Sequence, residues 1–167
     1  PFSCAAWIAS IHRGIDVARA MGLSHVAGCT GSTSEDAVRA HYGLPLEAML
    51  DMGDFAGGVL KYLRDHPVQR VTIGGGFGKS TKLAQGAMDL HSGRSQVDFE
   101  FLAGLAGRPE LVSANTAQEA LEIAGEGLAA KVAELALIEV RRVLGDARVE
   151  ADVMIVAGDG RVIGKAS

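Results

Sequence analysis

Cysteine, proline and aromatic residues are scarce in this 167-residue chain. It contains two cysteines, four prolines and only 5% aromatic residues. Cys4 and Cys29 have no neighbouring thiol and no metal-ligand spacing, so the sequence indicates neither a disulfide scaffold nor a zinc module, and a reducing compartment is expected. The low aromatic content is unlike that of proteins that stack nucleic-acid bases.

Long apolar runs and a net positive charge are absent as well. No apolar stretch is long enough to span a bilayer, because Arg13, Asp16 and Arg19 interrupt the first apolar region. No signal peptide is recognisable. The formal net charge of −4 argues against general nucleic-acid binding. We therefore expect a cytoplasmic protein that binds neither membranes nor nucleic acids.

Apolar segments with strand and helix character alternate along the chain, and 48% of its residues are hydrophobic. Strands are predicted at 25–29 and 71–73, helices at 11–21, 35–42, 46–51, 55–64, 79–87, 99–106 and 115–144, and a β-hairpin at 153–163. This pattern predicts one α/β domain over residues 1–167. We expect a mainly parallel sheet covered by helices, a Rossmann-like three-layer fold, with the C-terminal β-hairpin at one edge.

The stretch 71–99 carries the strongest functional signal. A short apolar strand runs into Gly74, Gly75 and Gly76, and a polar helix follows. A loop of this kind presents backbone N–H groups at a helix N-terminus, where an anion is favoured. Three glycines permit positive φ angles and the close approach of a ligand.

A phosphate-binding loop is one interpretation of this stretch. Gly78, Lys79 and Ser80 match the second half of the Gly-x-x-x-x-Gly-Lys-Ser/Thr pattern, but Ile73 stands where the first glycine should be. The loop is one residue too short for the cradle that this spacing creates. A Gly-rich connection after a buried strand is the simpler alternative.

A second strand, loop and helix precede this one. Thr30, Gly31, Ser32 and Thr33 follow the strand at 25–29, and Ser34 is predicted as the N-cap of the next helix. The loop offers hydroxyl and N–H groups to a ligand, although Ser and Thr are common helix caps in any protein. Because ligands of α/β sheets bind beyond the carboxyl ends of the strands, both loops are candidates.

Positive charge gathers around the glycine loop. Residues 61–95 contain six basic and two acidic residues, whereas the rest of the chain contains ten basic and eighteen acidic ones. Such a segment steers and holds an anionic ligand; a solvated basic face is the alternative.

Two polar groups of residues could carry acid/base chemistry. Asp51 and Asp54 precede the helix at 55–64, where Asp54 serves either as a helix cap or as an acid or base. His91 is a candidate general base near pH 7, and Arg94 a candidate bidentate partner for a carboxylate; a satisfied polar cluster of His91 with Asp89 and Asp98 is the alternative. No pair of histidines has zinc-like spacing, so we predict no protein-bound metal.

A family resemblance rests on several segments: SCAAWIASIHRGIDVARA, HVAGCTGSTSE, YGLP, DMGDFAGGVLKYL and, above all, GGGFGKSTKLAQGAMDLHSGRSQVDF. Over nearly its whole length the chain resembles the CbiD family of cobalamin-biosynthesis enzymes. Members of that family use S-adenosylmethionine to methylate carbon 1 of cobalt-precorrin-5B, giving cobalt-precorrin-6A in the anaerobic route to vitamin B12. They are longer than this chain, so the resemblance implies the C-terminal part of a two-domain enzyme whose missing N-terminal half is a partner.

The resemblance also implies the kind of ligand and cofactor: an anionic tetrapyrrole that carries its own cobalt, and S-adenosylmethionine as methyl donor. The residues that we expect to bind the substrate are Lys79, Ser80, Lys82, Arg94 and Gln96. Those expected at the methyl donor are Gly74, Gly75, Gly76, Thr30, Gly31, Ser32 and Thr33, and the candidate catalytic groups are His91, Asp89 and Asp54. Two alternatives remain open: a non-catalytic half that binds the tetrapyrrole, and a P-loop-like nucleotide-binding phosphotransferase. The sequence does not fix the oligomeric state, and a homo-oligomer is one possibility.

Overall fold

The structure is a computed structural model that describes residues 3–167. Its elements in chain order are α1 (Cys4–Ala20), β1 (His25–Cys29), α2 (Ser32–Tyr42), η1 (Leu46–Ala48), β2 (Met49–Leu50), α3 (Ala56–Asp65), β3 (Arg70–Gly75), α4 (Phe77–Ala84), α5 (Phe99–Ala106), η2 (Pro109–Ser113), α6 (Ala117–Ala124), α7 (Gly127–Leu144), β4 (Glu150–Val156) and β5 (Val162–Ala166). Here η denotes a 3-10 helix.

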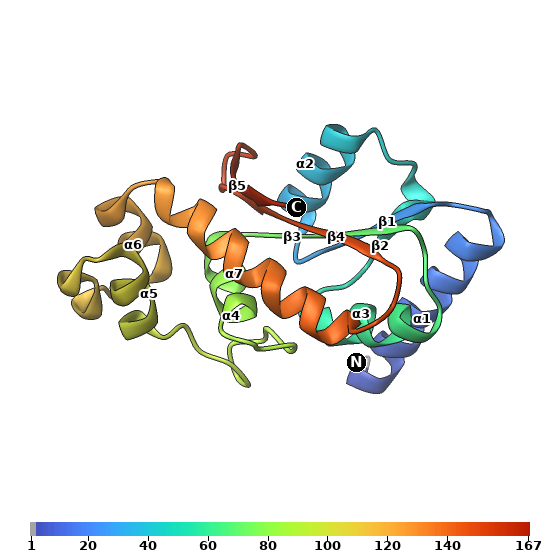
Figure 1. The fold of residues 1–167 in the computed structure, drawn as a ribbon, viewed down its shortest axis with the longest axis horizontal. Coiled ribbons are helices and arrows are strands. Elements are labelled where there is room, and N and C mark those ends of the chain that lie inside the picture. The colour runs from blue at the N-terminus through green and yellow to red at the C-terminus, as the bar shows by residue number, and fades with distance from the viewer. Residues whose placement is uncertain (1–2) are drawn as a thin grey trace.

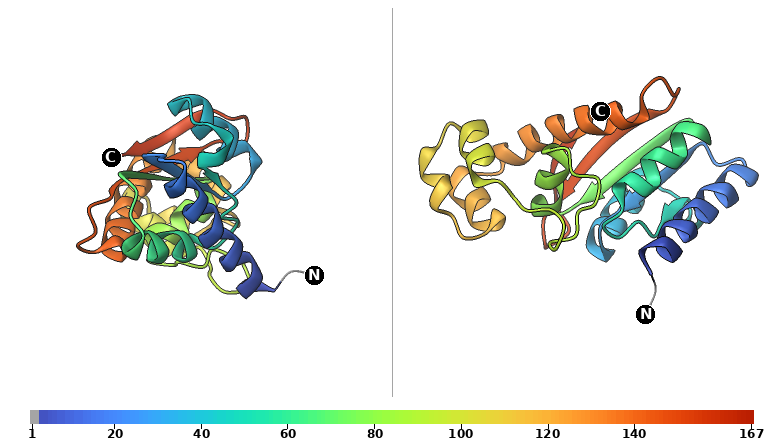
Figure 2. Two further views of the ribbon diagram at one scale, coloured as in Figure 1. Left: turned by 90° about the vertical axis from the view of Figure 1, so that its right-hand side faces the viewer. Right: turned by 90° about the horizontal axis from the view of Figure 1, so that it is seen from below.

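The strands form one sheet in the order β2-β1-β3-β4-β5 (Figure 1). The first four strands are parallel and β5 is antiparallel to β4. Helix α2 lies on one face of the sheet, while α1, α3 and α7 lie side by side across the other (Figure 2). The predicted α/β fold, with a mainly parallel sheet between helices and a C-terminal hairpin, is confirmed.

The core forms where α7 crosses the sheet. Val132, Ala136 and Val140 recur at helical spacing on its buried side and are fully covered. Close approach of α7 to β5 depends on Gly164, where a Cβ would lie 2.7 Å from the carbonyl oxygen of Ala129. Helices α5 and α6 extend beyond the sheet at one end of the molecule (Figure 1).

Two predicted helices were wrong. Residues 46–51 are not helical beyond Ala48, because Met49 and Leu50 pair with β1 as the short strand β2. The single helix predicted at 115–144 is two helices, because Gly125 adopts a φ of 90° and ends α6. With a ψ of 163° as well, Gly125 lies outside the helical regions, in a conformation that residues with a side chain rarely adopt.

The predicted helix starts need smaller corrections. Ser34 is the third residue of α2 and not its N-cap, which is Gly31. Asp54 does not cap α3, whose N-cap is Phe55. The polar helix predicted at 79–87 begins at Phe77, only one residue after β3.

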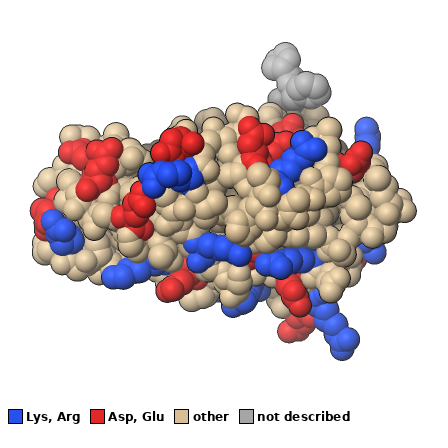
Figure 3. Space-filling view, turned by 90° about the horizontal axis from the view of Figure 1, so that it is seen from above, with Lys and Arg blue, Asp and Glu red and all other residues tan. Residues whose placement is uncertain are grey.

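Charged side chains are spread over the molecule. On the face that carries α2, Lys and Arg alternate with Asp and Glu among broader uncharged areas (Figure 3). Across residues 3–167, no helix combines the length and the apolar composition needed to cross a membrane.

Candidate functional site

The loops after β1 and β3 meet at the point where the strand order reverses. From β1 the chain runs through α2, on one face of the sheet, to β2, whereas from β3 it runs through helices that include α7, on the opposite face, to β4. The chain therefore leaves the neighbouring carboxyl ends of β1 and β3 toward opposite faces of the sheet. In the sheet order found here, this topological switch point is where flavodoxin-like folds bind their ligand.

A pocket of about 370 Å³ opens at this switch point. Its volume lies within the ~300–1,000 Å³ typical of small-molecule sites. It is lined by Thr30, Gly31, Ser32, Thr33, Ser34, Gly76, Phe77, Gln118, Val156, Ala157, Gly158 and Ile163. We call this cavity the switch-point pocket.

The N-termini of α2 and α4 both border the switch-point pocket. Neither helix has a side-chain cap on its first N–H groups, since Gly31 and Gly76 are the two N-caps. The first N–H groups of a helix have no acceptor within the helix and favour an anion or a hydroxyl group as partner. Ser34 is already engaged, since its hydroxyl donates to the carbonyl oxygen of Gly31 at 2.9 Å.

The three glycines after β3 have different roles. A Cβ at Gly74 would lie 2.7 Å from the side chain of Val38, and one at Gly75 would lie 3.0 Å from that of Thr30. Only Gly76 has open space where a side chain would be. None of the three has a positive φ, so the structure does not use the conformational freedom that glycine permits there. Gly74 and Gly75 permit packing, and Gly76 keeps the pocket open.

The candidate catalytic and carboxylate-binding residues gather in a second place, around the loop after β2. Phe55 forms an isolated β-bridge with Asp89, and the N–H of Leu90 donates to the carbonyl oxygen of Asp54 at 2.8 Å. Lys79 Nζ lies 2.6 Å from Asp54 Oδ1. Arg94 forms an ion pair with Asp89. We call Asp54, Lys79, Asp89, His91 and Arg94 the charged cluster.

The charged cluster adjoins the switch-point pocket through α4. Phe77 in the first turn of α4 lines the pocket, and Lys79, two residues further on, contacts Asp54. The Oδ1 atom of Asp54 is buried and, within the described chain, has this ion pair but no hydrogen bond of ordinary geometry. The ion pair with Lys79 is therefore the partner of this buried oxygen.

Asp89 and His91 are organised by their neighbours. Burial raises the pKa of Asp89, but the hydrogen bond from Arg94, the N–H of His91 and the guanidinium charge together hold it below its ordinary value. The Nδ1 atom of His91 accepts a hydrogen bond from the N–H of Gly93 at 2.9 Å. A neutral His91 therefore carries its proton on Nε2, where it can donate a hydrogen bond but cannot accept a proton.

Three of the predicted substrate-binding residues, Ser80, Lys82 and Gln96, do not face the pockets of the candidate site. Lys82 is buried, with its Nζ donating to the carbonyl oxygen of Leu90 at 3.0 Å. Ser80 is buried beneath the glycine loop, and Gln96 is exposed with its amide bound to the Ser92 carbonyl. In the described chain these side chains line neither the switch-point pocket nor the cavities beside the charged cluster.

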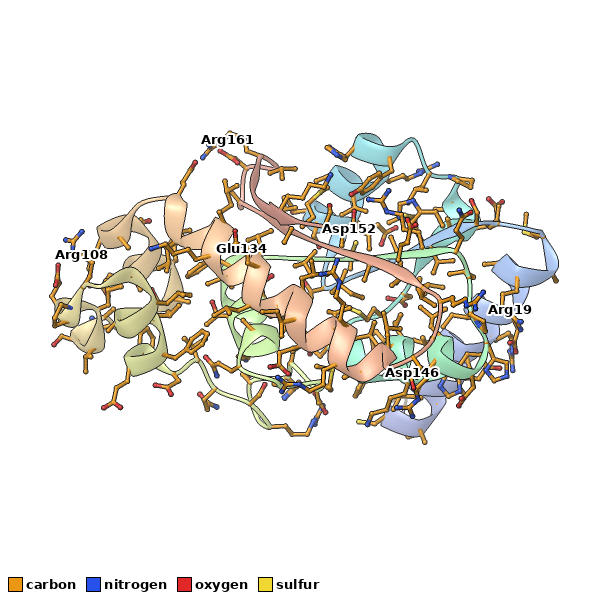
Figure 4. The ribbon with its side chains drawn as sticks, viewed as in Figure 1. Arg19, Arg108, Glu134, Asp146, Asp152 and Arg161 are labelled. Atoms are coloured by element: carbon orange, nitrogen blue, oxygen red, sulfur yellow. The ribbon has the colours of Figure 1, made fainter. Side chains whose placement is uncertain are left out.

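The predicted basic segment is not one free cationic surface. Lys79 and Arg94 are paired with carboxylates, and Lys82 is buried. Arg70 forms an ion pair with Asp152, which is labelled in Figure 4 and also binds Tyr42 of α2. Charges that neighbour each other along the chain are therefore divided between two faces of the sheet.

Sequence analysis missed a groove between α1 and α3. It has a volume of about 510 Å³ and a smaller hollow of about 260 Å³ beside it. The groove is lined by Cys4, Ile8, His12, Phe55, Gly57, Gly58, Lys61, Met88, Asp89 and Arg94, and Trp7 lines the hollow. The signal in the sequence was an aromatic residue, Trp7, at an exposed helix position.

A buried polar network on the α2 face was also missed. Asp152 is fully buried and accepts hydrogen bonds from Tyr42, Arg70 and Thr72. Burial, the hydrogen bond to Asp152 and the charge of that carboxylate raise the pKa of Tyr42 to about 12. An aspartate between Ala151 and Val153 in the buried part of strand β4 could have revealed this network, because a buried charge needs partners.

Comparison with known proteins gives a consistent result. Residues 89–167 match the sequence family described as CbiD, C-terminal domain. The chain is 58% identical to the cobalt-precorrin-5B C(1)-methyltransferase of Paramagnetospirillum magneticum, with 99% of this chain and 49% of that protein covered. It is 55% identical to the protein of the same name from Brucella canis, with coverages of 99% and 48%. The chain thus spans about half the length of the curated relatives it matches. No solved structure matches it significantly.

Proposed function

This chain belongs to the CbiD family, and on that premise we propose that it contributes to an S-adenosylmethionine-dependent methyltransferase acting on carbon 1 of cobalt-precorrin-5B. The observation that carries the proposal is the switch-point pocket, where two hydroxyl- and glycine-rich loops and two uncapped helix N-termini meet. We assign this pocket to the methyl donor.

The residues around the pocket fit such a donor. Thr30, Ser32 and Thr33 offer hydroxyl groups, and the N-termini of α2 and α4 offer N–H donors, which suit the carboxylate and ribose hydroxyls of the methionine and nucleoside parts. Gly76 leaves room for close approach. When bound, S-adenosylmethionine supplies a methyl group activated by a sulfonium.

The charged cluster is assigned to the substrate rim. A precorrin is a macrocycle fringed with acetate and propionate groups, and Lys79 and Arg94 are the cations of the cluster that remain partly exposed, at 41% and 45%. Charge-assisted hydrogen bonds to carboxylates are among the stronger polar contacts in proteins. His91 adds an Nε2–H donor, and Asp54 holds Lys79 in place through their ion pair.

Little side-chain chemistry is needed beyond binding. An electron-rich ring carbon is itself the nucleophile, so the chain's main contribution is to orient the two ligands and exclude water. The first turn of α4, which borders both the switch-point pocket and the charged cluster, suits that role.

The phosphotransferase alternative finds little support. Only Gly76 separates β3 from α4, so no loop is present that could wrap around a nucleotide's phosphates. The non-catalytic alternative is closer to the proposal. In it, this chain would bind the tetrapyrrole, and the half of the longer relatives that this chain does not match would bind the methyl donor.

Titration calorimetry with S-adenosylmethionine, S-adenosylhomocysteine and ATP–magnesium in one buffer separates these possibilities. Saturable binding of the two adenosyl ligands, but not of ATP, is expected. Gly76→Leu should abolish it by filling the pocket, whereas Gly104→Leu, at an exposed glycine that also has open space around it, should not. Absence of adenosyl binding would favour the non-catalytic alternative, and binding of ATP alone would overturn the proposal.

A further inference from the structure

The groove between α1 and α3 has an open, apolar floor. Helix α3 begins Ala56, Gly57, Gly58, so its first turn has almost no side chains on this side. A Cβ at Gly57 would already lie 3.0 Å from the Cβ of Met88. The floor is therefore shaped by backbone and by the flanking apolar side chains of Ile8 and Met88.

A rigid aromatic side chain stands beside this floor. The indole Nε1 of Trp7 donates to the carbonyl oxygen of Asp51 at 2.8 Å, and its ring packs against Gly53, where a Cβ would lie 2.8 Å away. The Phe55 ring is 6.2 Å from that of Trp7, tilted by 60°. Trp7 is still 36% exposed. Its orientation is thus fixed before any ligand arrives, which lowers the entropic cost of stacking.

Cations border the aromatic rings. The Arg94 guanidinium lies 5.9 Å from the centre of the Phe55 ring. Its ion pair with Asp89 is partly exposed, at 45% and 34%, and such pairs are weak enough for a ligand carboxylate to displace one partner. Lys61 lines the groove and has no ion-pair partner among the residues described.

A flat apolar ring with carboxylates at its edge matches this combination. We propose that the groove between α1 and α3 and the hollow beside Trp7 bind one edge of a planar polycarboxylated tetrapyrrole, with the ring against Trp7 and Phe55 and carboxylates at Lys61 and Arg94. The assignment rests on the function proposed above and adds to it a place for the macrocycle, where Asp89 lines the groove and Asp54 lines the hollow.

Uroporphyrin, a tetrapyrrole with carboxylates on every pyrrole ring, is the probe. Trp7 is the single tryptophan of the chain, so its fluorescence reports on this surface alone. Titration should quench it saturably, after correction for light absorption with free N-acetyltryptophanamide. Lys61→Ala combined with Arg94→Gln should raise the Kd about tenfold or more, as expected for the loss of charge-assisted contacts.

The matched control is Arg39→Gln combined with Lys131→Ala, which removes the same charge from α2 and α7 and should leave the Kd unchanged. Circular dichroism verifies that both double variants are folded. Equal weakening by both pairs would reveal nonspecific charge attraction and overturn the assignment, as would quenching that never saturates. If the wild-type chain binds the adenosyl ligands but not uroporphyrin, only this inference is refuted; if it binds uroporphyrin but not the adenosyl ligands, only the donor assignment is refuted.

Discussion

Arg70 on β3 reaches across to Asp152 on β4, with its Nη2 atom 2.6 Å from Oδ2 of a carboxylate that is fully buried. The hydroxyls of Tyr42 and Thr72 donate to the same carboxylate, and Thr72 in turn contacts His25 Nε2 at 2.8 Å. Every oxygen of the buried group thus has a donor, which is the condition under which a buried charge is tolerated.

Replacing Asp152 with alanine should destabilise the fold strongly. The change leaves a guanidinium and two hydroxyls without their acceptor, and breaking a buried pair in this way costs about 3 kcal/mol. Urea denaturation measures the loss. Asp146→Ala, at an exposed aspartate after α7, should change the free energy of unfolding by less than about 0.5 kcal/mol. Similar losses in both variants would mean that the network contributes nothing special.

His25 should make stability depend on pH. Burial lowers its pKa, as does the charge of Arg70, and the carboxylate of Asp152 only partly opposes them. The folded state therefore favours neutral His25, so its contribution is complete above the ordinary pKa of about 6.5 and is lost as the pH falls below it. Between about pH 7.5 and pH 5.5, the melting temperature of the wild type should fall more than that of His25→Gln. Parallel curves would exclude this role.

Gly58→Ala should stabilise the protein. Gly58 lies inside α3, and a Cβ there would be 3.5 Å from Ile11 and Phe55, an ordinary contact. The gain expected from helix propensity is about 0.5–1 kcal/mol. Gly57→Ala is the comparison, since its Cβ would press on Met88 at 3.0 Å and should bring no such gain. Chemical denaturation measures the free energy of unfolding of both variants, and an equal gain in the two would contradict this prediction.

Gly164→Ala should have the opposite effect. Its Cβ would lie 2.7 Å from a backbone oxygen of α7, so strand β5 or the helix must move, at a cost of about 1–3 kcal/mol. Gly158→Ala, in the turn before β5, meets nothing within 4 Å and should be neutral in thermal melts. A neutral Gly164→Ala would show that α7 and β5 can separate easily.

Lys79→Ala combined with Arg94→Ala tests the assignment of the charged cluster to the substrate. Two lost carboxylate contacts should raise the substrate KM about a hundredfold, with a smaller effect on kcat. Steady-state kinetics at saturating methyl donor provide the measurement. An unchanged KM would remove both residues from the substrate site.

Local sequence signals gave the main architecture. β1 occupies His25–Cys29, as its apolar run predicted, and α5 begins at the predicted Phe99 after the Asp98 cap. These elements are predictable because their signals lie within a few residues. By contrast, β2 is two residues long and exists only because β1 offers it a partner. Its sequence has no signal of its own.

The candidate site was predictable in part. That the loops at Thr30 and Gly76 would meet follows from parallel strands, and their function stays a prediction. The pairing of Asp54 with Lys79, 25 positions apart, could not be foreseen, because capping α3 was an equally good local role for Asp54. The α1–α3 groove likewise depends on packing between distant helices, which no periodicity encodes.

The register of β3 and β4 bears on how the chain folds. Thr72 pairs with Asp152, 80 positions later, whereas β1, β2 and β3 all come from the first 75 residues. Distant contacts form slowly, because the chain between them must be ordered before they stabilise anything. During folding, one edge of strand β3 should therefore stay unpaired, and able to form non-native strand pairs, until α7 has packed and β4 pairs with it. The rate-limiting step of refolding should be the closure of the sheet.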